Sequence, residues 1–126
     1  MKVADSSYLT EGILRDAALL EKETLVSPDL ALYEVVNTLW KHEILIGDVK
    51  DSQERIELLL DLISNEQVRL VRPDKKLLNE SYALSLKHRL PIYDSIFVAL
   101  ALQLNMDLAT FDNKQSTVLT KEKHTN

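Results

Sequence analysis

Residues 90–102 read Leu-Pro-Ile-Tyr-Asp-Ser-Ile-Phe-Val-Ala-Leu-Ala-Leu, a pattern that predicts a buried helix carrying one carboxylate. Pro91 suits the first helical position, because its φ angle is already helical and its missing N–H would have no partner there. Steps of three and four from Asp94 reach the apolar residues Phe97, Val98, Ala101 and Leu102. A carboxylate on such a face is costly unless it is hydrogen-bonded, paired or bound to a metal. Asp94 is therefore a candidate site residue, the alternative being an acid that only complements the helix dipole.

The composition is typical of one globular domain, with 126 residues of which 45% are hydrophobic and 28% charged. The chain has no cysteine, which excludes disulfides, cysteine-ligated zinc and a thiol nucleophile. Its two glycines, Gly12 and Gly47, are too few for a glycine-rich phosphate loop. No apolar run is long enough to span a bilayer and no signal segment precedes Asp5. We therefore expect a cytoplasmic protein with no membrane partner.

The order of strand and helix patterns predicts an α/β fold, a three-layer α/β/α domain with a central, mostly parallel sheet of four to five strands. The expected strands are residues 1–4, 24–26, 67–72 and 107–112, with a marginal fifth at 117–119. The first expected helix spans residues 6–22 with a break near Gly12, and the second spans 28–47, with Ser27 as its N-cap and Pro28 as its first residue. Asp48 or Asp51 opens the third helix, the fourth runs from Asp74 to residue 89, and the fifth covers 91–104. We expect one domain over residues 1–120 and a loose polar tail at 121–126.

Four acids occupy positions where such a fold binds ligands, the carboxyl ends of its parallel strands. Asp5 and Asp112 end the first and fourth strands, and Glu34 and Asp94 lie early in helices near strand ends. Four converging carboxylates repel one another unless a cation neutralises them, and oxygen ligands without Cys or His favour Mg²⁺ or Mn²⁺. Such a site suits metal-assisted hydrolysis of a phosphodiester. Each acid alone could equally cap a helix or face solvent, so the joint placement carries the hypothesis.

Four segments resemble the signature segments of PIN domains, and in particular those of the VapC-like toxins of toxin–antitoxin pairs. They are Asp5 after the first strand and residues 33–37 (Tyr-Glu-Val-Val-Asn), 93–101 (Tyr-Asp-Ser-Ile-Phe-Val-Ala-Leu-Ala) and 108–112 (Leu-Ala-Thr-Phe-Asp). The resemblance covers about residues 1–115. It implies a Mg²⁺- or Mn²⁺-dependent endoribonuclease, a homodimer, and a VapB-type antitoxin that blocks the site. The implied acidic cluster is Asp5, Glu34, Asp94 and Asp112, supported by Ser6, Asn37 and Thr110, to which we add Asn113.

Two features depart from that family. The chain ends 14 residues after Asp112, which leaves little room for a last helix and strand, and residues 113–115 (Asn-Lys-Gln) lack the apolar residue often seen after the last aspartate. The net charge of −5 is not typical of a nucleic-acid-binding protein, although a metal held by acids can still act on phosphates. The candidate RNA contacts are Lys41, Lys87, Arg89 and Lys114. The apolar helix around residues 58–60 suggests a contact between subunits.

Other classes fit the residues less well. A response-regulator receiver needs an adjacent acid pair after the first strand, and a haloacid-dehalogenase phosphatase needs Asp-x-Asp, whereas Asp5 is followed by Ser6 and Ser7. The rival from another class is a catalytically silent PIN-like module that binds RNA or a partner. The four acids argue against it, because a non-catalytic site has no need for so much partly buried negative charge. Stabilisation by Mg²⁺ or Mn²⁺ would distinguish the two.

Overall fold

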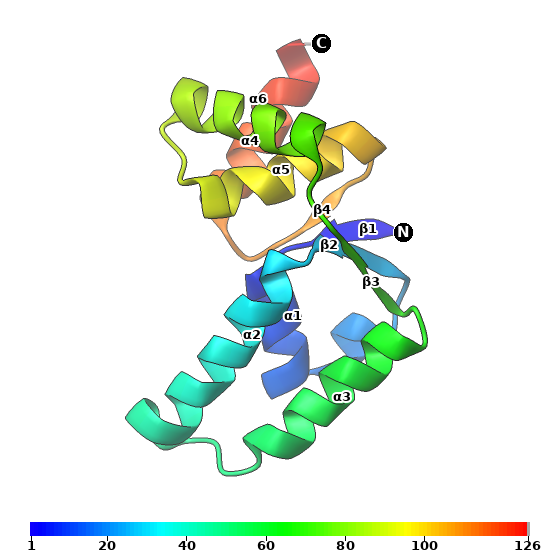
Figure 1. Cartoon of the computed structure of the whole chain (residues 1–126), viewed down its shortest axis with the longest axis vertical. Helices are drawn as coiled ribbons and strands as arrows, with labels where there is room; N and C mark the ends of the chain where they lie inside the picture. The colour runs from blue at the N-terminus through cyan, green and yellow to red at the C-terminus, as the bar shows by residue number, and fades with distance from the viewer. Residues whose placement is uncertain (126) are drawn as a thin grey trace.

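A parallel sheet of four strands, described in a computed structural model of residues 1–125, separates two layers of helices (Figure 1). The strands are β1 (Lys2–Ala4), β2 (Leu25–Pro28), β3 (Val68–Val71) and β4 (Leu108–Ala109). They lie in the order β3-β2-β1-β4, and every neighbouring pair is parallel. The predicted α/β class and parallel sheet are confirmed. Because the chain moves outward from β1 to both sides, the strand order reverses at β1, and the carboxyl ends of β1 and β4 flank the expected ligand crevice.

The helices divide between the two faces of this sheet. On one side lie α1 (Ser6–Leu14), the 3₁₀ helix η1 (Ala17–Leu20), α2 (Leu30–Trp40), its π-helical continuation η2 (Lys41–Ile46), and α3 (Ser52–Ser64). On the other side lie α4 (Lys75–His88), α5 (Ile92–Leu104) and α6 (Asn113–Thr125). Within residues 1–125, none of these helices combines the length and the hydropathy that a membrane span requires.

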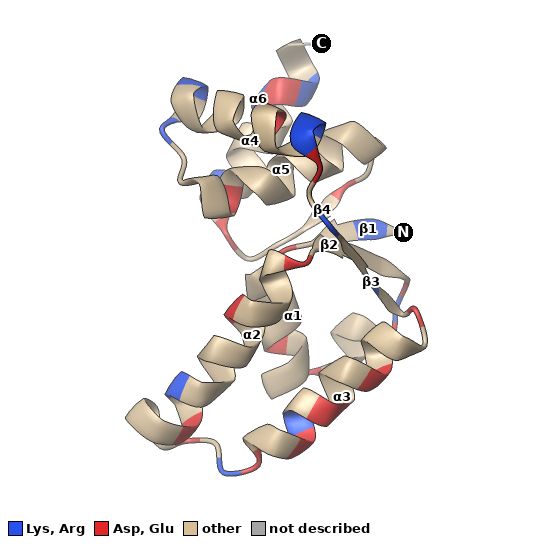
Figure 2. Ribbon diagram, in the orientation of Figure 1, with Lys and Arg blue, Asp and Glu red and all other residues tan. Residues whose placement is uncertain are grey.

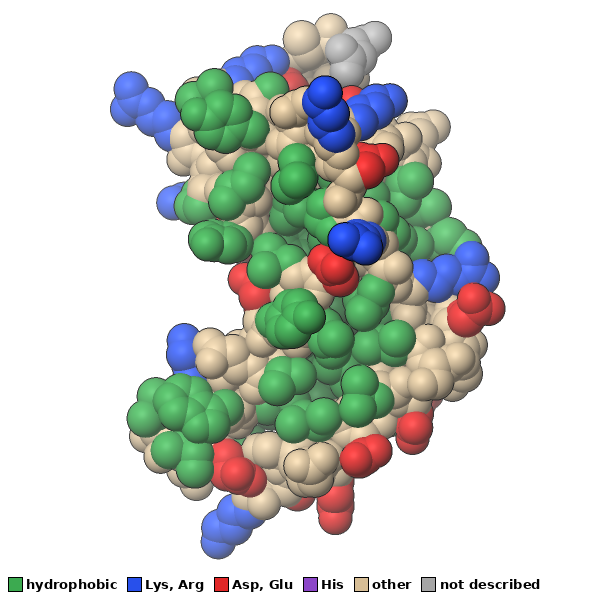
Figure 3. Space-filling view, viewed as in Figure 1, with side chains coloured by type: hydrophobic (Ala, Val, Ile, Leu, Met, Phe, Trp, Pro, Cys, Tyr) green, Lys and Arg blue, Asp and Glu red, His purple; other side chains and the backbone are tan. Residues whose placement is uncertain are grey.

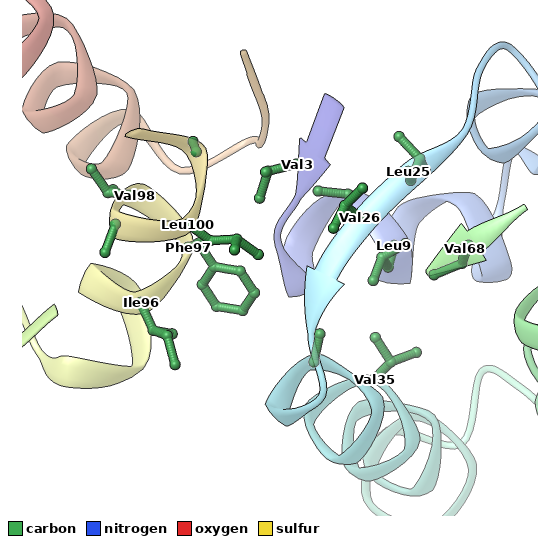
Figure 4. Packing of buried hydrophobic residues seen from close by; sticks show 14 of the residues in the cluster. Val3, Leu9, Leu25, Val26, Val35, Val68, Ile96, Phe97, Val98 and Leu100 are labelled. Atoms are coloured by element: carbon green, nitrogen blue, oxygen red, sulfur yellow. The ribbon is translucent and has the colours of Figure 1, made fainter. Parts of the chain in front are cut away.

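Helix α5 is the centre of the core, as residues 90–102 predicted. All seven residues from position 95 to 101 are buried, so the helix is covered nearly all round. Phe97 and Leu100 point toward the sheet, where Val3 of β1 and Val26 of β2 meet them (Figure 4). Asp94 sits in the first turn of this buried helix and is thereby fixed next to the end of β1.

Pro28 and Pro91 both lie just outside the helices that we expected them to open. Pro91 is the N-cap of α5 and has extended backbone angles, φ −57° and ψ 149°. Pro28 is the last residue of β2, and α2 begins at Leu30 after Asp29. The expectation of proline at the first helical position was wrong in both cases by one or two residues.

The two glycines have different roles. Gly12 does not break the first helix, which runs unbroken to Leu14. A Cβ at Gly12 would clash with the side chain of Leu20 in η1. The glycine therefore lets η1 pack directly against α1. Gly47 ends η2 in the left-handed region, with φ 81°, which is the helix end that the sequence predicted.

The C-terminal segment differs from the prediction. Residues 117–119, expected as a marginal fifth strand, belong to α6, and the strand expected at 107–112 is reduced to Leu108–Ala109. Lys121 to Thr125, expected to be loose, are helical, and residue 126 lies outside the described residues. Val118 and Leu119 are buried in the contact of α6 with α5. The chain after Asp112 therefore does accommodate a last helix.

Candidate active site

The four acids lie at the carboxyl edge of the sheet, each placed there by a different element. Asp5 directly follows β1 and caps α1, Glu34 is in the second turn of α2, Asp94 is in the first turn of α5, and Asp112 precedes α6. Acidic segments of α2, of the start of α5 and of the loop before α6 lie toward the same side of the molecule (Figure 2). On that side the surface is hollowed between the two helical layers, with acidic atoms at the rim (Figure 3).

Asp5 is the most tightly held of the four, with 2% of its surface exposed. Its Oδ1 accepts hydrogen bonds from the Ser7 hydroxyl at 2.7 Å and the Tyr8 N–H at 3.0 Å. Its Oδ2 accepts one from the Thr110 hydroxyl at 2.5 Å. These three bonds offset the cost of burying the carboxylate and fix its orientation. Asp5 is therefore a helix cap and a member of the acidic group at the same time.

Thr110 joins Asp5 to Asp112. Its hydroxyl donates to Asp5 and accepts the backbone N–H of Asp112 at 2.8 Å. The Oδ1 of Asp112 in turn accepts the N–H of Lys114 at 2.8 Å and that of Gln115 at 3.3 Å, which caps the start of α6. One threonine thus ties the loop after β4 to the end of β1.

The surroundings of Glu34 and Asp94 disfavour the charged form of each carboxyl and raise its pKa. Burial raises the pKa of the Glu34 carboxyl; the 2.6 Å hydrogen bond from the Ser6 hydroxyl opposes this, and the charges of Asp94 and Asp5 raise it further. Burial also raises the pKa of Asp94, the charge of Asp112 adds to this rise, and the Gln115 amide opposes it. Glu34 therefore lies within electrostatic range of Asp94 and Asp5, and Asp94 lies within range of Asp112 and Asp5.

The donor set fits a hard cation that keeps part of its water shell. Within residues 1–125, no three His, Cys, Asp or Glu side chains stand close enough together to hold a metal ion directly. Mg²⁺ is usually bound through one or two carboxylates and retains several waters, so a looser ring of carboxylate oxygens suits it. The raised pKa values of Glu34 and Asp94 indicate negative charge that a cation would offset.

The other residues singled out in the sequence divide into three groups. Ser6 and Thr110 donate hydrogen bonds to the acids. Asn37 and Asn113 are exposed, and their side chains make no hydrogen bond to any described residue. The four basic candidates differ as follows: Lys87 is paired with Glu122 at 2.8 Å, Lys41 is exposed at the start of η2, and Arg89 and Lys114 line one pocket.

Two side chains at the acids were missed. Gln115 is 2% exposed and its Nε2 donates to Oδ1 of Asp94 at 3.2 Å, while its Oε1 is buried without a partner among the described residues. Ser7 donates to Asp5 and accepts the N–H of Phe111 at 3.1 Å. A prediction of helix rather than strand after Asp112 would have found this residue. It would have placed Gln115 in the first turn of that helix, three residues after Asp112, which caps the helix.

Comparisons with known proteins show which family this chain is similar to. The family model of the PIN domain matches residues 7–119. The chain is also similar to Ribonuclease VapC3 of Pyrobaculum aerophilum, with 33% identity over 99 residues, which cover 79% of this chain and 74% of that protein. The matched region contains Glu34, Asp94 and Asp112 and begins two residues after Asp5.

Proposed function

Because this chain belongs to the PIN domain family, we propose that it is a metal-dependent endoribonuclease that hydrolyses RNA phosphodiester bonds. The observation that carries the proposal is the gathering of Asp5, Glu34, Asp94 and Asp112 at one edge of the sheet, with the pKa values of two of them raised. Such an arrangement is unfavourable for folding alone and is typical of a site whose function needs the charge. The named ribonuclease relative supports RNA as the substrate.

The proposed ligands of a Mg²⁺ or Mn²⁺ ion are these four carboxylates, directly or through water. When bound, the ion would acidify water and stabilise the charge on phosphoryl oxygens. Asp5 acts as the fixed anchor, because three hydrogen bonds orient it. Ser6 holds Oε1 of Glu34 and leaves Oε2 without a partner among the described residues, available to a water or a ligand. Gln115 orients Asp94 in the same way through Oδ1.

We also propose that the protein is the toxin of a type II toxin–antitoxin pair, with a VapB-like antitoxin as partner. The similarity to Ribonuclease VapC3 supports this assignment. So does the exposure of large apolar side chains, a feature typical of surfaces that bind another protein. On α2 and η2 the exposed large apolar side chains are Tyr33, Trp40, Ile44, Leu45 and Ile46.

A homodimer is the third part of the proposal. Helix α4 presents Leu78, Tyr82 and Leu86 at intervals of four residues, and they are 47%, 60% and 67% exposed. Such a row of apolar side chains on one helix face is suited to pairing with another subunit. Apolar side chains spread over this face of the molecule (Figure 3). In α3, Leu59 is buried, whereas Leu58 and Leu60 are 37% and 41% exposed. The row on α4 is more exposed, so we propose α4 ahead of α3 as the surface of the subunit contact.

Cleavage of a labelled RNA in Mn²⁺, Mg²⁺ or EDTA tests the enzymatic proposal. Wild type and Asp94→Asn are compared with Asp61→Asn, a matched loss of one exposed acid on α3. We expect metal-dependent cutting by wild type and Asp61→Asn, and its loss in Asp94→Asn. Full cutting by Asp94→Asn would refute the role of Asp94.

The alternative, a silent module that binds RNA or a partner, is favoured by one observation: within the described chain no three acids are close enough to share an ion directly. No cutting by wild type, together with no rise in melting temperature on adding Mn²⁺, would establish this alternative.

A further inference from the structure

Two basic side chains from distant parts of the sequence line one pocket beside the acids. The pocket, of about 370 Å³, lies between the turn from α4 to α5 and the first turns of α6. Its lining residues are His88, Arg89, Leu90, Asn113, Lys114, Thr117 and Val118. Within residues 1–125 neither Arg89 nor Lys114 makes an ion pair, whereas nearby Lys87 is held by Glu122. Both cations are therefore available to a ligand.

The backbone at Arg89 is in the left-handed region, with φ 52° and ψ 45°, where it caps the end of α4. Glycine is the residue that normally occupies this position, because a Cβ there is sterically unfavourable. Local conformation therefore does not explain the arginine. The cost of this backbone conformation is consistent with a role for the guanidinium in the pocket.

The pocket adjoins the acidic site at the start of α6. Lys114 follows Asp112 by two residues, and its backbone N–H donates to Oδ1 of Asp112 at 2.8 Å. Leu90, which also lines the pocket, is only four residues before Asp94.

We propose that this pocket binds a phosphate of the RNA chain adjacent to the phosphodiester that is cut, with Arg89 and Lys114 as its two charged contacts. The inference rests on the proposed ribonuclease function and adds to it the side from which the substrate reaches the acids. A guanidinium can bind two phosphate oxygens at once, and an ammonium adds a point charge. Together they offset the repulsion that a net-acidic protein exerts on RNA.

Salt dependence of RNA binding tests the pocket. A labelled single-stranded RNA is titrated with the Asp94→Asn protein in EDTA at several KCl concentrations, with Arg89→Gly or Lys114→Gln added to that background. A plot of log affinity against log salt has a negative slope, and each lost phosphate contact should make that slope shallower by about 0.7. Lys121→Gln serves as the control and should leave the slope unchanged, because Lys121 is an exposed lysine of the same helix with no ion pair among the described residues.

Arg89→Gly also separates binding from folding. Glycine suits the backbone angles at this position, so the melting temperature should not fall while RNA affinity does. An unchanged slope in both Arg89→Gly and Lys114→Gln would refute phosphate binding in this pocket. RNA cleavage by the wild type would then still support the proposed function. If the wild type neither binds nor cuts RNA, the pocket and the proposed function both fail.

Discussion

Replacing Thr110 by valine keeps the shape of the side chain and removes the hydroxyl that joins Asp5 to Asp112. The change removes a 2.5 Å hydrogen bond to a carboxylate that is 2% exposed, and it removes the acceptor of the Asp112 N–H. A hydrogen bond to a charged group contributes about 1.5–3 kcal/mol, and burial of Asp5 leaves little water to replace it. We therefore expect the free energy of unfolding to fall by about 2–3 kcal/mol. The melting temperature of a domain of this size should fall by roughly 10 °C.

Urea unfolding of wild type, Thr110→Val and Thr120→Val measures this effect. Thr120 is exposed and its hydroxyl donates only to the Ser116 carbonyl of its own helix, at 2.9 Å, so its replacement should cost less than about 0.5 kcal/mol. A cycle that combines Thr110→Val with Asp5→Asn should give an interaction energy of about 1 kcal/mol or more. Equal stability of Thr110→Val and Thr120→Val would show that the Asp5–Thr110 hydrogen bond does not hold this edge of the sheet together.

Two further predictions concern Glu34 and Asp94 and the glutamine that contacts Asp94. A carboxyl whose pKa is higher in the folded than in the unfolded chain lowers stability as the pH rises above its unfolded value. Glu34→Gln and Asp94→Asn should therefore raise the melting temperature at pH 7, and this gain should vanish below the ordinary pKa values of 4.5 and 3.8; a gain that persists at lower pH would contradict the assignment. Gln115→Leu removes a buried amide oxygen that has no partner, so stability should change by less than about 1 kcal/mol. The apparent Mn²⁺ affinity of this variant, followed by thermal shift, should fall about tenfold, because Asp94 loses the amide donor that orients it. An unchanged affinity would exclude an orienting role for Gln115.

The sequence predicts the centre of this fold better than its edges. Residues 90–102 identify α5 because an almost continuous apolar run of this length can only be a helix buried on most sides. Alternation of strands and helices is enough to predict parallel pairing. Helix ends are harder, since a proline fits both the residue before a helix and its first position, and only tertiary contacts decide between them.

The C-terminal segment was misassigned for a similar reason. Three consecutive residues, Thr117 to Leu119, have high strand propensity, and only their packing against α5 makes them helical. The same error hid Gln115, because its approach to Asp94 depends on the helical turn that follows Asp112. The acids themselves were placed from topology, since strand ends of a parallel sheet lie at one edge whatever the exact bounds of the strands.

The hydrogen bonds of the four acids have a consequence for how this chain can change over generations. Asp5 and Asp112 each cap a helix, so replacing them removes structural bonds even in a protein that no longer needs to act on RNA. Glu34 and Asp94 have raised pKa values and are costly to the fold. In a lineage released from selection for cleavage, we expect Glu34 and Asp94 to drift to neutral residues first. Asp5 and Asp112 should be retained longest, because the fold still needs their capping hydrogen bonds after the activity is lost.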